Sequence, residues 1–388
     1  MYRRSRRVSI AALDRNRATR HNAGTRHAIA KGHPVRRKWL TTALKYSIGL
    51  ALLAWVLYSN WDGIHSAVSR PMRPECFALA AALVACVVMI TFIRWYVLVR
   101  AQDLPFTLRD AVRLGLIGYF FNTFLPGSVG GDLLKAAFIA REQERRTVAV
   151  STVLIDRGVG LWGLVGLCAI VGGVFWACDD PVLSNNADLK RVVRVAIAFM
   201  GATAALWLFL GVLPERRAHR FAQRLHSIPR LGKILAEFWR AVWLYRSRGK
   251  TILGTLLMSM GAHVLTVLAF YFAARTFQPP GEPAQMPGVL EHFVLVPAGK
   301  TFQGFFPAPG GIGGAEFVFG LLYERLGYPP EGGILGNIGT RIVEWSLGLI
   351  GYVAYLFMKR DVPGASHPDH KLIDSISPEA GSSTMQES

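Results

Sequence analysis

The chain has 388 residues, of which 52% are hydrophobic and 18% are charged, and its mean hydropathy is +0.30. Soluble domains carry roughly 25% charged residues, so this composition indicates a chain embedded in a membrane. It excludes a coiled coil and a compact nucleic-acid-binding domain, and no nucleic-acid partner is expected. The four cysteines form no C-x-x-C pair and have no His at metal-ligand spacing. This excludes a disulfide-rich secreted protein and predicts neither a metal site nor any other cofactor.

The formal net charge of +19 is unevenly distributed along the chain. Residues 1–38 carry 12 of the 44 Lys and Arg residues and a single acid, Asp14. We expect this segment to be a disordered, basic cytoplasmic arm. Residues 361–388 are polar and rich in Ser, Pro and Glu, and we expect a disordered tail. The expected transmembrane domain lies between the two, at residues 39–360.

Six apolar stretches of this domain are long enough to cross about 30 Å of hydrocarbon, which takes about 20 helical residues. They comprise residues 39–58, 77–99, 148–176, 192–213, 252–274 and 334–358. Ten Lys and Arg lie in residues 214–250, where we expect a basic interfacial loop with an amphipathic helix. Cytoplasmic loops are rich in Lys and Arg. We therefore expect a multi-pass protein of the cell (inner) membrane with its N-terminus and C-terminus in the cytoplasm.

Two further apolar segments, residues 111–135 and 289–323, are interrupted at their middles. The interruptions fall at two Pro-Gly pairs, Pro126-Gly127 and Pro309-Gly310. Pro removes a backbone donor, and Gly destabilises a helix by about 1 kcal/mol relative to Ala, so neither segment can be one continuous helix. We expect two re-entrant helical hairpins, with the Pro-Gly pairs as structural hinges.

The two interruptions are alike in sequence. Residues 126–132 read Pro-Gly-Ser-Val-Gly-Gly-Asp, and residues 309–316 read Pro-Gly-Gly-Ile-Gly-Gly-Ala-Glu. A second match lies downstream, because Arg157 and Arg341 follow the two motifs at nearly the same distance. Two agreeing matches predict an internal repeat.

Residues 39–177 form the first expected repeat and residues 192–360 the second. Each contains two spanning helices, one broken hairpin and a third span. Because three spans is an odd number, the second repeat enters the membrane with opposite polarity, as in the inverted repeats of secondary transporters. Irregular backbone at membrane depth must be buried in protein or line a wet cavity. The fold class expected is therefore an all-α polytopic membrane protein whose two hairpins, entering from opposite sides, face each other.

The hairpins contain most of the candidate binding residues. A Gly-Gly pair ahead of a helix leaves backbone N–H groups bare at its N-terminus, which is a natural anion site. The glycines concerned are Gly130, Gly131, Gly313 and Gly314. Asp132 and Glu316 follow in the first turn, where a carboxylate either caps the helix or contacts substrate. Lys135 either pairs locally with Asp132 or faces the same cavity. Three polar hairpin residues complete the expected lining: Asn122, Lys300 and Gln303.

Arg157 and Arg341 are the strongest candidates for substrate contact. They lie inside apolar spans, and a guanidinium group binds phosphate through two parallel hydrogen bonds. Their nearest possible partners are Asp156 and Glu344, and pairing alone would make the arginines structural. Arg94 lies nearer a helix end, where snorkelling to the surface would explain it. We expect two histidines to be packing residues: His263 and His292.

The sequence shows no catalytic constellation. It lacks a G-x-S-x-G motif, a P-loop, an H-E-x-x-H motif and a dinucleotide-binding fingerprint in strand–helix context. The longest stretches outside the expected membrane segments have about 38 residues, which is too short for a soluble catalytic domain. No catalytic residue is assigned.

In the motif from Asn122 to Lys135 and in residues 309–316, the chain resembles the lysylphosphatidylglycerol synthase transmembrane-region, or flippase-like, family of integral membrane proteins. The resemblance covers about residues 39–360. It implies a protein that moves a phospholipid or another lipid-linked anion between leaflets. The aminoacyl-transferase domain of bifunctional members is missing from the sequence, so their lysyl transfer is not carried over. Lys135 stands where the family usually has Arg, which keeps the charge and loses the bidentate contact.

Three functions follow as hypotheses. The favoured one is a lipid translocator in which re-entrant helix N-termini and intramembrane arginines hold the headgroup phosphate. The first alternative is a membrane enzyme or accessory subunit that acts on a lipid-linked substrate, with Asp132, Asp156 or Glu316 as acid or base. The second is a structural partner that docks a separate lipid-modifying enzyme on residues 214–250. Membrane lipids are the expected partners in each case.

Overall fold

The computed structural model describes residues 34–360 apart from residues 125–129, 143–145, 282, 284 and most of 213–247. The described residues are helical and contain no strand. Most of the predicted arm and the whole predicted tail lie outside them, as do the hinge residues Pro126 and Gly127.

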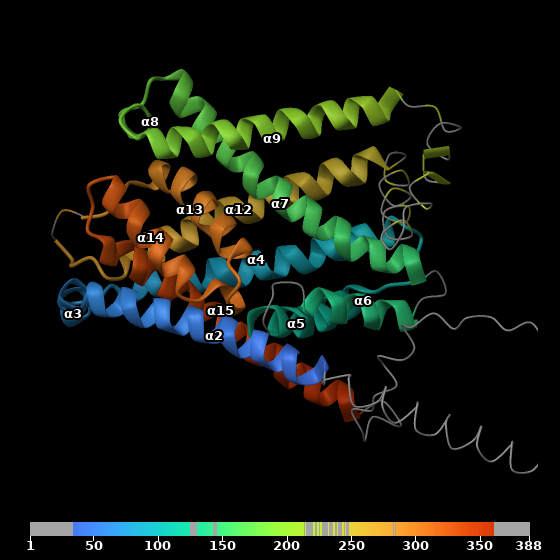
Figure 1. Cartoon of the computed structure of the whole chain (residues 1–388), viewed down its shortest axis with the longest axis horizontal. Coiled ribbons are helices and arrows are strands. Elements are labelled where there is room, and N and C mark those ends of the chain that lie inside the picture. Colours follow the sequence, from blue (N-terminus) through green and yellow to red (C-terminus); the bar gives the residue numbers. More distant parts are fainter. Residues whose placement is uncertain are drawn as a thin grey trace, which may run out of the picture.

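Long helices account for most of the structure (Figure 1). They are α2 (Pro34–Ser59), α4 (Pro74–Arg100), α7 (Arg146–Ala177), α9 (Ala187–Val212), α12 (Gly249–Arg275) and α15 (Pro330–Arg360). The shorter elements are α3 (Trp61–Ser69), α5 (Leu108–Phe124), α6 (Gly130–Glu142), α8 (Pro181–Ser184), α13 (Val289–Phe305), the 3-10 turn η1 (Pro309–Gly311) and α14 (Gly314–Arg325).

Among the described residues, four of the long helices are long and apolar enough to cross a membrane, namely α4, α7, α9 and α12. The other two expected crossings lie in α2, whose described apolar part is the shorter stretch Ala43–Ser59, and in the 31-residue helix α15. The helix α2 begins at Pro34, before the expected end of the arm at residue 38. Proline is favoured at the first position of a helix, and the Arg and Lys residues that follow are good helix formers.

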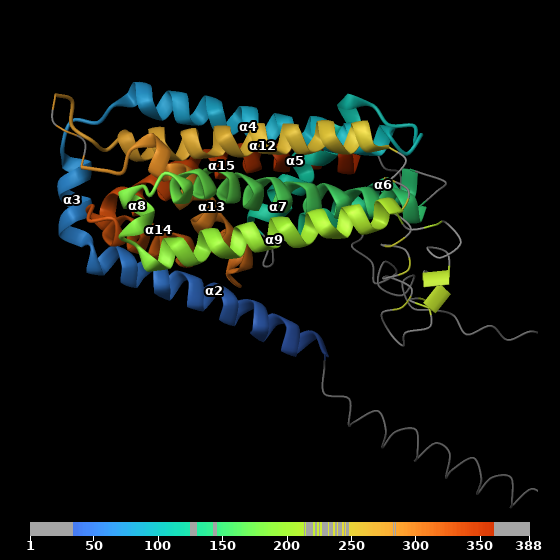
Figure 2. The same cartoon turned by 90° about the horizontal axis from the view of Figure 1, so that it is seen from above.

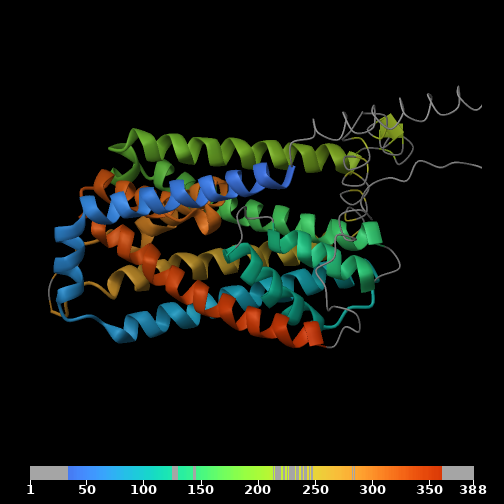
Figure 3. The ribbon, with the colours of Figure 1, turned by 60° about the horizontal axis from the view of Figure 1, so that its bottom comes forward.

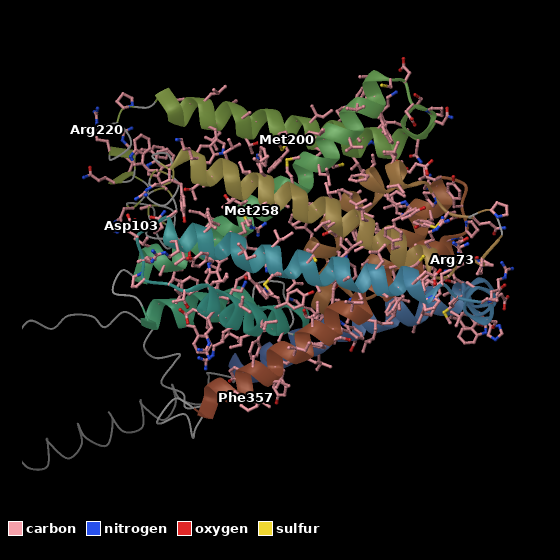
Figure 4. All side chains as sticks on the ribbon, turned by 180° about the vertical axis from the view of Figure 1, so that it is seen from behind. Arg73, Asp103, Met200, Arg220, Met258 and Phe357 are labelled. Atoms are coloured by element: carbon pink, nitrogen blue, oxygen red, sulfur yellow. The ribbon has the colours of Figure 1, made fainter. Side chains whose placement is uncertain are left out.

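The bundle has two ends, which Figure 4 marks by Asp103 and Arg220 on one side and by Arg73 on the other. At the Asp103 end, Arg248 pairs with Asp103 across 2.7 Å and Tyr245 donates a hydrogen bond of 3.0 Å to the Leu98 carbonyl. These contacts dock the end of the basic 214–250 segment onto the last turn of α4 and the loop after it. Burial raises the pKa of Tyr245 to about 12. At the other end, the Arg73 N–H donates to the Thr276 carbonyl at 2.9 Å and joins α4 to α12.

Two pairs of short helices enter the bundle from these two ends. In Figures 1 and 2, α6 lies toward the Asp103 end and α14 toward the end that holds α3 and α8. The inner ends of the pairs meet, because η1 packs against both α5 and α2. At this junction, the Tyr46 hydroxyl of α2 donates a 2.7 Å hydrogen bond to the Phe124 carbonyl at the end of α5.

Apolar packing fixes the helices around this junction. Phe270 of α12 and Phe319 of α14 are fully buried, with ring centroids 4.3 Å apart, beside buried Tyr323. Figure 3 shows α15 crossing the bundle obliquely, and it packs against α5, α12 and α14. Large apolar side chains also cover the outside of the bundle, as Leu208 (73% exposed) and Phe357 (61% exposed) illustrate. An apolar exterior of this kind suits contact with lipid tails.

Candidate functional site

Each hairpin is attached to the bundle by the same kind of ion pair. Asp132, in the first turn of α6, pairs with Arg157 of α7. Glu316, in the first turn of α14, pairs with Arg341 of α15, with Oε1 and Nε 2.8 Å apart. In both cases the arginine follows the acid by 25 residues. The repeated motif therefore makes a repeated contact between the second hairpin helix and the long helix that follows it.

In the second hairpin, Glu316 acts as a helix cap. Its Oε2 accepts a 2.8 Å hydrogen bond from the Gly313 N–H, and its Oε1 accepts one of 2.9 Å from the Asn337 side-chain amide. The residue is 1% exposed. Gly314 begins α14 and is buried. A carboxylate at this position satisfies a bare backbone donor and interacts favourably with the helix dipole. The capping role considered for Glu316 is thus the one its contacts show.

In the first hairpin, the side chain of Asn122 provides part of the helix capping. The Asn122 Oδ1 accepts a 2.8 Å hydrogen bond from the Gly131 N–H, while its Nδ2 lies 3.3 Å from Asp132 Oδ1. Gly130 begins α6. Gly131 lies so close to α5 that a Cβ there would collide with the Gly118 carbonyl oxygen. The bare N–H groups expected before α6 are therefore partly occupied by Asn122.

The partners expected for the two arginines are not the ones they have. Asp156 pairs with Arg94, with Oδ1 and Nε 2.8 Å apart, and Glu344 pairs with Lys300 at 3.3 Å. Adjacent residues on an α-helix point about 100° apart. Asp156 and Arg157 therefore face different neighbours, and only Arg157 reaches α6.

The expectation that Arg94 snorkels to the surface is wrong. Arg94 is 5% exposed, and besides pairing with Asp156 it donates a 3.0 Å hydrogen bond from Nη1 to the Ser259 hydroxyl. These contacts join α4, α7 and α12. A guanidinium inside an apolar bundle is expensive without partners, which is why the residue occupies this network.

Lys135 is also buried, at 7% exposure, but its described contacts are aromatic. Its ammonium nitrogen lies 5.2 Å from the Trp95 ring centroid and 6.0 Å from that of Phe92. Cation–π contact of this kind is worth about 2 kcal/mol or more where water is excluded. The local pair with Asp132 considered for Lys135 is not among its contacts in the described part of the chain.

A cavity of about 270 Å³ lies beside the tip of the second hairpin. Lys300, Gln303 and Gly310 line it, together with His263 and Glu344. The Lys300 ammonium donates to Glu344 Oε1 at 3.3 Å across the space between α13 and α15. Of the three polar hairpin residues expected to line a cavity, Lys300 and Gln303 line this one and Asn122 is not among its described lining residues.

A second cavity, of about 170 Å³, lies on the side of α4 and α5. It shares Thr266, Lys300 and Glu344 with the first, and Tyr119 lines it as well. The Lys300–Glu344 pair therefore lies between two cavities and lines both of them. The sequence suggested Glu344 only as a partner of Arg341 and gave no signal for Thr266 or Tyr119, because neither belongs to a motif.

The turn between α13 and α14 is stabilised by hydrogen bonds to a backbone carbonyl within the turn. Gly310, with a φ of +56°, accepts hydrogen bonds from the Gln303 side-chain amide (2.9 Å) and from Arg341 Nη1 (3.1 Å). Four buried polar atoms of Gln303, Asn337 and Arg341 have no hydrogen-bond partner among the described residues: Gln303 Oε1, Asn337 Oδ1 and Arg341 Nε and Nη2, although Nε lies within ion-pair distance of Glu316. Buried polar atoms are ordinarily satisfied, and Gln303 lines the larger cavity, so unused hydrogen-bonding capacity lies beside it.

The two histidines expected to be packing residues, His263 and His292, differ in their surroundings. His292 is fully buried and holds the Tyr323 hydroxyl at 2.7 Å, which agrees with a packing role. His263 also contacts its neighbours through a 2.9 Å hydrogen bond to the Gly160 carbonyl, yet it lines the larger cavity. The described residues hold no group of three His, Cys, Asp or Glu side chains suited to a metal ion.

The chain matches a known family and is similar to known membrane proteins. The family described as the lysylphosphatidylglycerol synthase TM region matches residues 42–351. The chain is similar to a UPF0104 membrane protein of Methanothermobacter thermautotrophicus, with 21% identity over 86% of this chain and 98% of the relative. It is also similar to a UPF0104 membrane protein of Pyrococcus horikoshii, with 29% identity over 80% of this chain and 95% of the relative.

The family match covers both Pro/Gly-broken hairpins and the arginines attached to them, together with the four apolar helices. This chain is therefore an integral membrane protein and belongs to the lysylphosphatidylglycerol synthase transmembrane-region family.

Proposed function

We propose that this protein moves a phospholipid, or another lipid that carries a phosphate, between the leaflets of its membrane. One observation carries the proposal: the two broken hairpins meet beside a cavity that Lys300, Gln303 and Glu344 line, inside a bundle with an apolar exterior. A lipid has the complementary shape, since its headgroup needs a polar space at membrane depth and its tails need an apolar flank.

We further propose that the two halves are inverted in a cell (inner) membrane, with six full crossings and both termini in the cytoplasm. The matching Asp132–Arg157 and Glu316–Arg341 pairs support a repeat. The entry of the hairpins from opposite ends of the bundle supports inversion (Figures 1 and 2). The concentration of Lys and Arg near the Asp103 end supports a cytoplasmic position for that end.

The candidate residues divide into two roles in this proposal. Lys300 and Gln303 line the cavity and would contact the headgroup directly. The acid–arginine pairs hold the hairpin helices against α7 and α15, so that movement of a hairpin breaks or remakes an ion pair. Arg157, whose side chain is 44% exposed, is the better placed of the two arginines to meet a lipid phosphate during that movement, because the Arg341 side chain is 7% exposed.

Transport in reconstituted vesicles tests the proposal. Lipids labelled on an acyl chain are incorporated with the protein, and an impermeant quencher reports their arrival in the outer leaflet. We expect Arg157→Ala and Arg341→Ala to abolish transport, whereas Arg157→Lys retains part of it because the charge remains and the bidentate contact is lost. Arg191→Ala is the matched control, since Arg191 is exposed in α9 and pairs only at the surface among its described contacts. Wild-type transport rates in both alanine variants would refute the proposal.

The enzymatic alternative receives less support from the geometry. Asp132, Asp156 and Glu316 were its candidate acids and bases, and each is ion-paired with an arginine. None of the three is therefore free for proton transfer in this arrangement. Product formation by the purified protein from a candidate lipid, lost in Asp132→Asn, would reverse this preference.

A further inference from the structure

The charged lining of the central cavities is balanced. Lys300 and Glu344 are the charged residues that line the two spaces in the described part of the chain, and they face each other at 3.3 Å. The neighbouring Arg341 is already neutralised by Glu316. The site thus offers one cation and one anion within a few ångströms of each other, with no net charge.

We infer that the cavity takes a headgroup with one phosphate and one ammonium, as in phosphoethanolamine, in preference to a purely anionic headgroup. This inference rests on the proposed function, because it assumes that the ligand is a lipid. The ammonium would lie beside the Glu344 carboxylate and the phosphate beside the Lys300 ammonium, so that ligand and protein form a ring of alternating charges.

Unused acceptors support the ammonium position. Gln303 lines the larger cavity, and its buried Oε1 has no hydrogen-bond partner among the described residues. An ammonium has three donors and no acceptor, so it can bond to Glu344 and, once the Gln303 side chain rotates to bring Oε1 into the cavity, to this amide oxygen as well. A phosphate, which only accepts at neutral pH, would find Lys300 but would place its remaining oxygens against the carboxylate.

The free-energy cost of burying a net charge also favours a headgroup with one phosphate and one ammonium. A net charge that enters a low-dielectric space must be compensated, whereas a neutral pair of charges that matches the lining leaves none uncompensated. The headgroup of phosphatidylglycerol would leave one negative charge in the cavity. A lysyl ester of phosphatidylglycerol carries two ammonium groups and one phosphate and would leave one positive charge. The cavity volume of about 270 Å³ also lies just below the usual range for ligand pockets, which favours a compact headgroup.

The surroundings favour a lipid over a free solute. Gly304 of α13 lines the larger cavity and is exposed. The next residue, Phe305, is 77% exposed. The cavity therefore borders an apolar outer surface at the hairpin tip, where acyl chains can lie while the headgroup reaches Lys300 and Glu344.

Single-charge variants give the test, because they should shift lipid selectivity in opposite directions. Transport is measured in vesicles that contain phosphatidylethanolamine, phosphatidylglycerol or lysyl-phosphatidylglycerol, each labelled on an acyl chain. The wild type should prefer phosphatidylethanolamine. Glu344→Gln leaves Lys300 unbalanced and should raise the phosphatidylglycerol-to-phosphatidylethanolamine ratio about tenfold, which corresponds to one charge contact of about 1.4 kcal/mol. Lys300→Met should instead shift preference toward the lysyl lipid.

Matched controls and a double variant separate selectivity from damage to the fold. Glu324→Gln and Lys250→Met change the same residue types at exposed positions and should leave all ratios unchanged. Lys300→Glu combined with Glu344→Lys restores neutrality and should restore the preference for phosphatidylethanolamine if the singles fold poorly. A residue that only supports the fold would lower transport of all three lipids together.

The possible results distinguish failure of the headgroup inference from failure of the proposed lipid transport. If the wild type moves phosphatidylglycerol at least as well as phosphatidylethanolamine, or if both singles shift selectivity the same way, the headgroup inference is overturned while lipid transport stands. If no lipid is moved, transport fails, and native mass spectrometry of the protein with the same three lipids decides the inference. Retention of phosphatidylethanolamine above the other two supports it, and equal retention overturns it.

Discussion

Gly313 shows how strongly a single backbone position constrains the second hairpin. Its φ is +79°, and a Cβ there would collide with the Gly49 carbonyl oxygen and come within 2.8 Å of the Leu53 backbone nitrogen, both in α2. Only glycine combines this dihedral angle with such close contact. The residue therefore lets α2 pack directly onto the hairpin tip.

We predict that Gly313→Ala destabilises the protein by about 1–3 kcal/mol, since backbone strain and a clash against main-chain atoms act together. Gly261→Ala is the matched control, because a Cβ at Gly261 in α12 meets nothing within 4 Å and alanine is favoured in a helix. Thermal unfolding in detergent measures both variants. Equal stability of the two would contradict the close packing of α2 on the hairpin.

The buried Glu316–Arg341 pair gives a second prediction at this scale. Removing one partner leaves the other charged and buried, at a cost of about 3–5 kcal/mol, because Glu316 and Arg341 are 1% and 6% exposed. We expect Glu316→Gln to lower the unfolding temperature far more than Asp188→Asn, a matched carboxylate-to-amide change in an exposed pair. Comparable shifts in the two variants would show that the buried pair contributes no more than a surface one.

At the scale of the secondary-structure elements, the contact between the hairpin tips allows a test of whether transport requires the hairpins to move. A Cβ at Gly310 would lie 3.3 Å from the Thr123 carbonyl oxygen, so η1 touches the end of α5. With the native cysteines replaced, we predict that Thr123→Cys and Gly310→Cys form a disulfide on mild oxidation and that transport stops until the bond is reduced. The pair Thr123→Cys and Ser184→Cys, with Ser184 in α8, serves as control and should form no bond. Full transport by the oxidised, cross-linked protein would exclude movement of the tips against each other.

At the scale of the whole molecule, the distribution of charge predicts which end faces the cytoplasm. Asp103 lies at the end near the basic 214–250 segment, and Cys178 is exposed between α7 and α8. Because Lys and Arg are retained on the cytoplasmic side, we predict that an impermeant maleimide labels Cys178 from outside intact cells. A cysteine introduced at Asp103 should be labelled only after the membrane is opened. Labelling of both positions from outside would contradict the placement of the two ends of the bundle on opposite sides of the membrane.

The family and its membrane character could be read from the sequence because both depend on local pattern. Apolar runs of about 20 residues predict helices that can cross a membrane, and Pro-Gly interruptions predict where a helix must end; neither inference needs the partner elements. The helices α4, α7, α9 and α12 and the break between α13 and α14 appear where these patterns place them. The residues that fill the binding space could be named only as candidates.

Tertiary structure alone decided which charges meet. Arg94 and Asp156 are 62 residues apart, and Lys300 and Glu344 are 44 residues apart; each pair lies on two helices whose relative rotation no local pattern specifies. A turn of about 100° between adjacent residues sends Asp156 to α4 and Arg157 to α6. The sequence by itself thus determined that this is a helical membrane protein with two interrupted apolar segments and several charged residues within its apolar segments. Packing between distant helices determined that those charges form pairs and that one pair stands at the cavity.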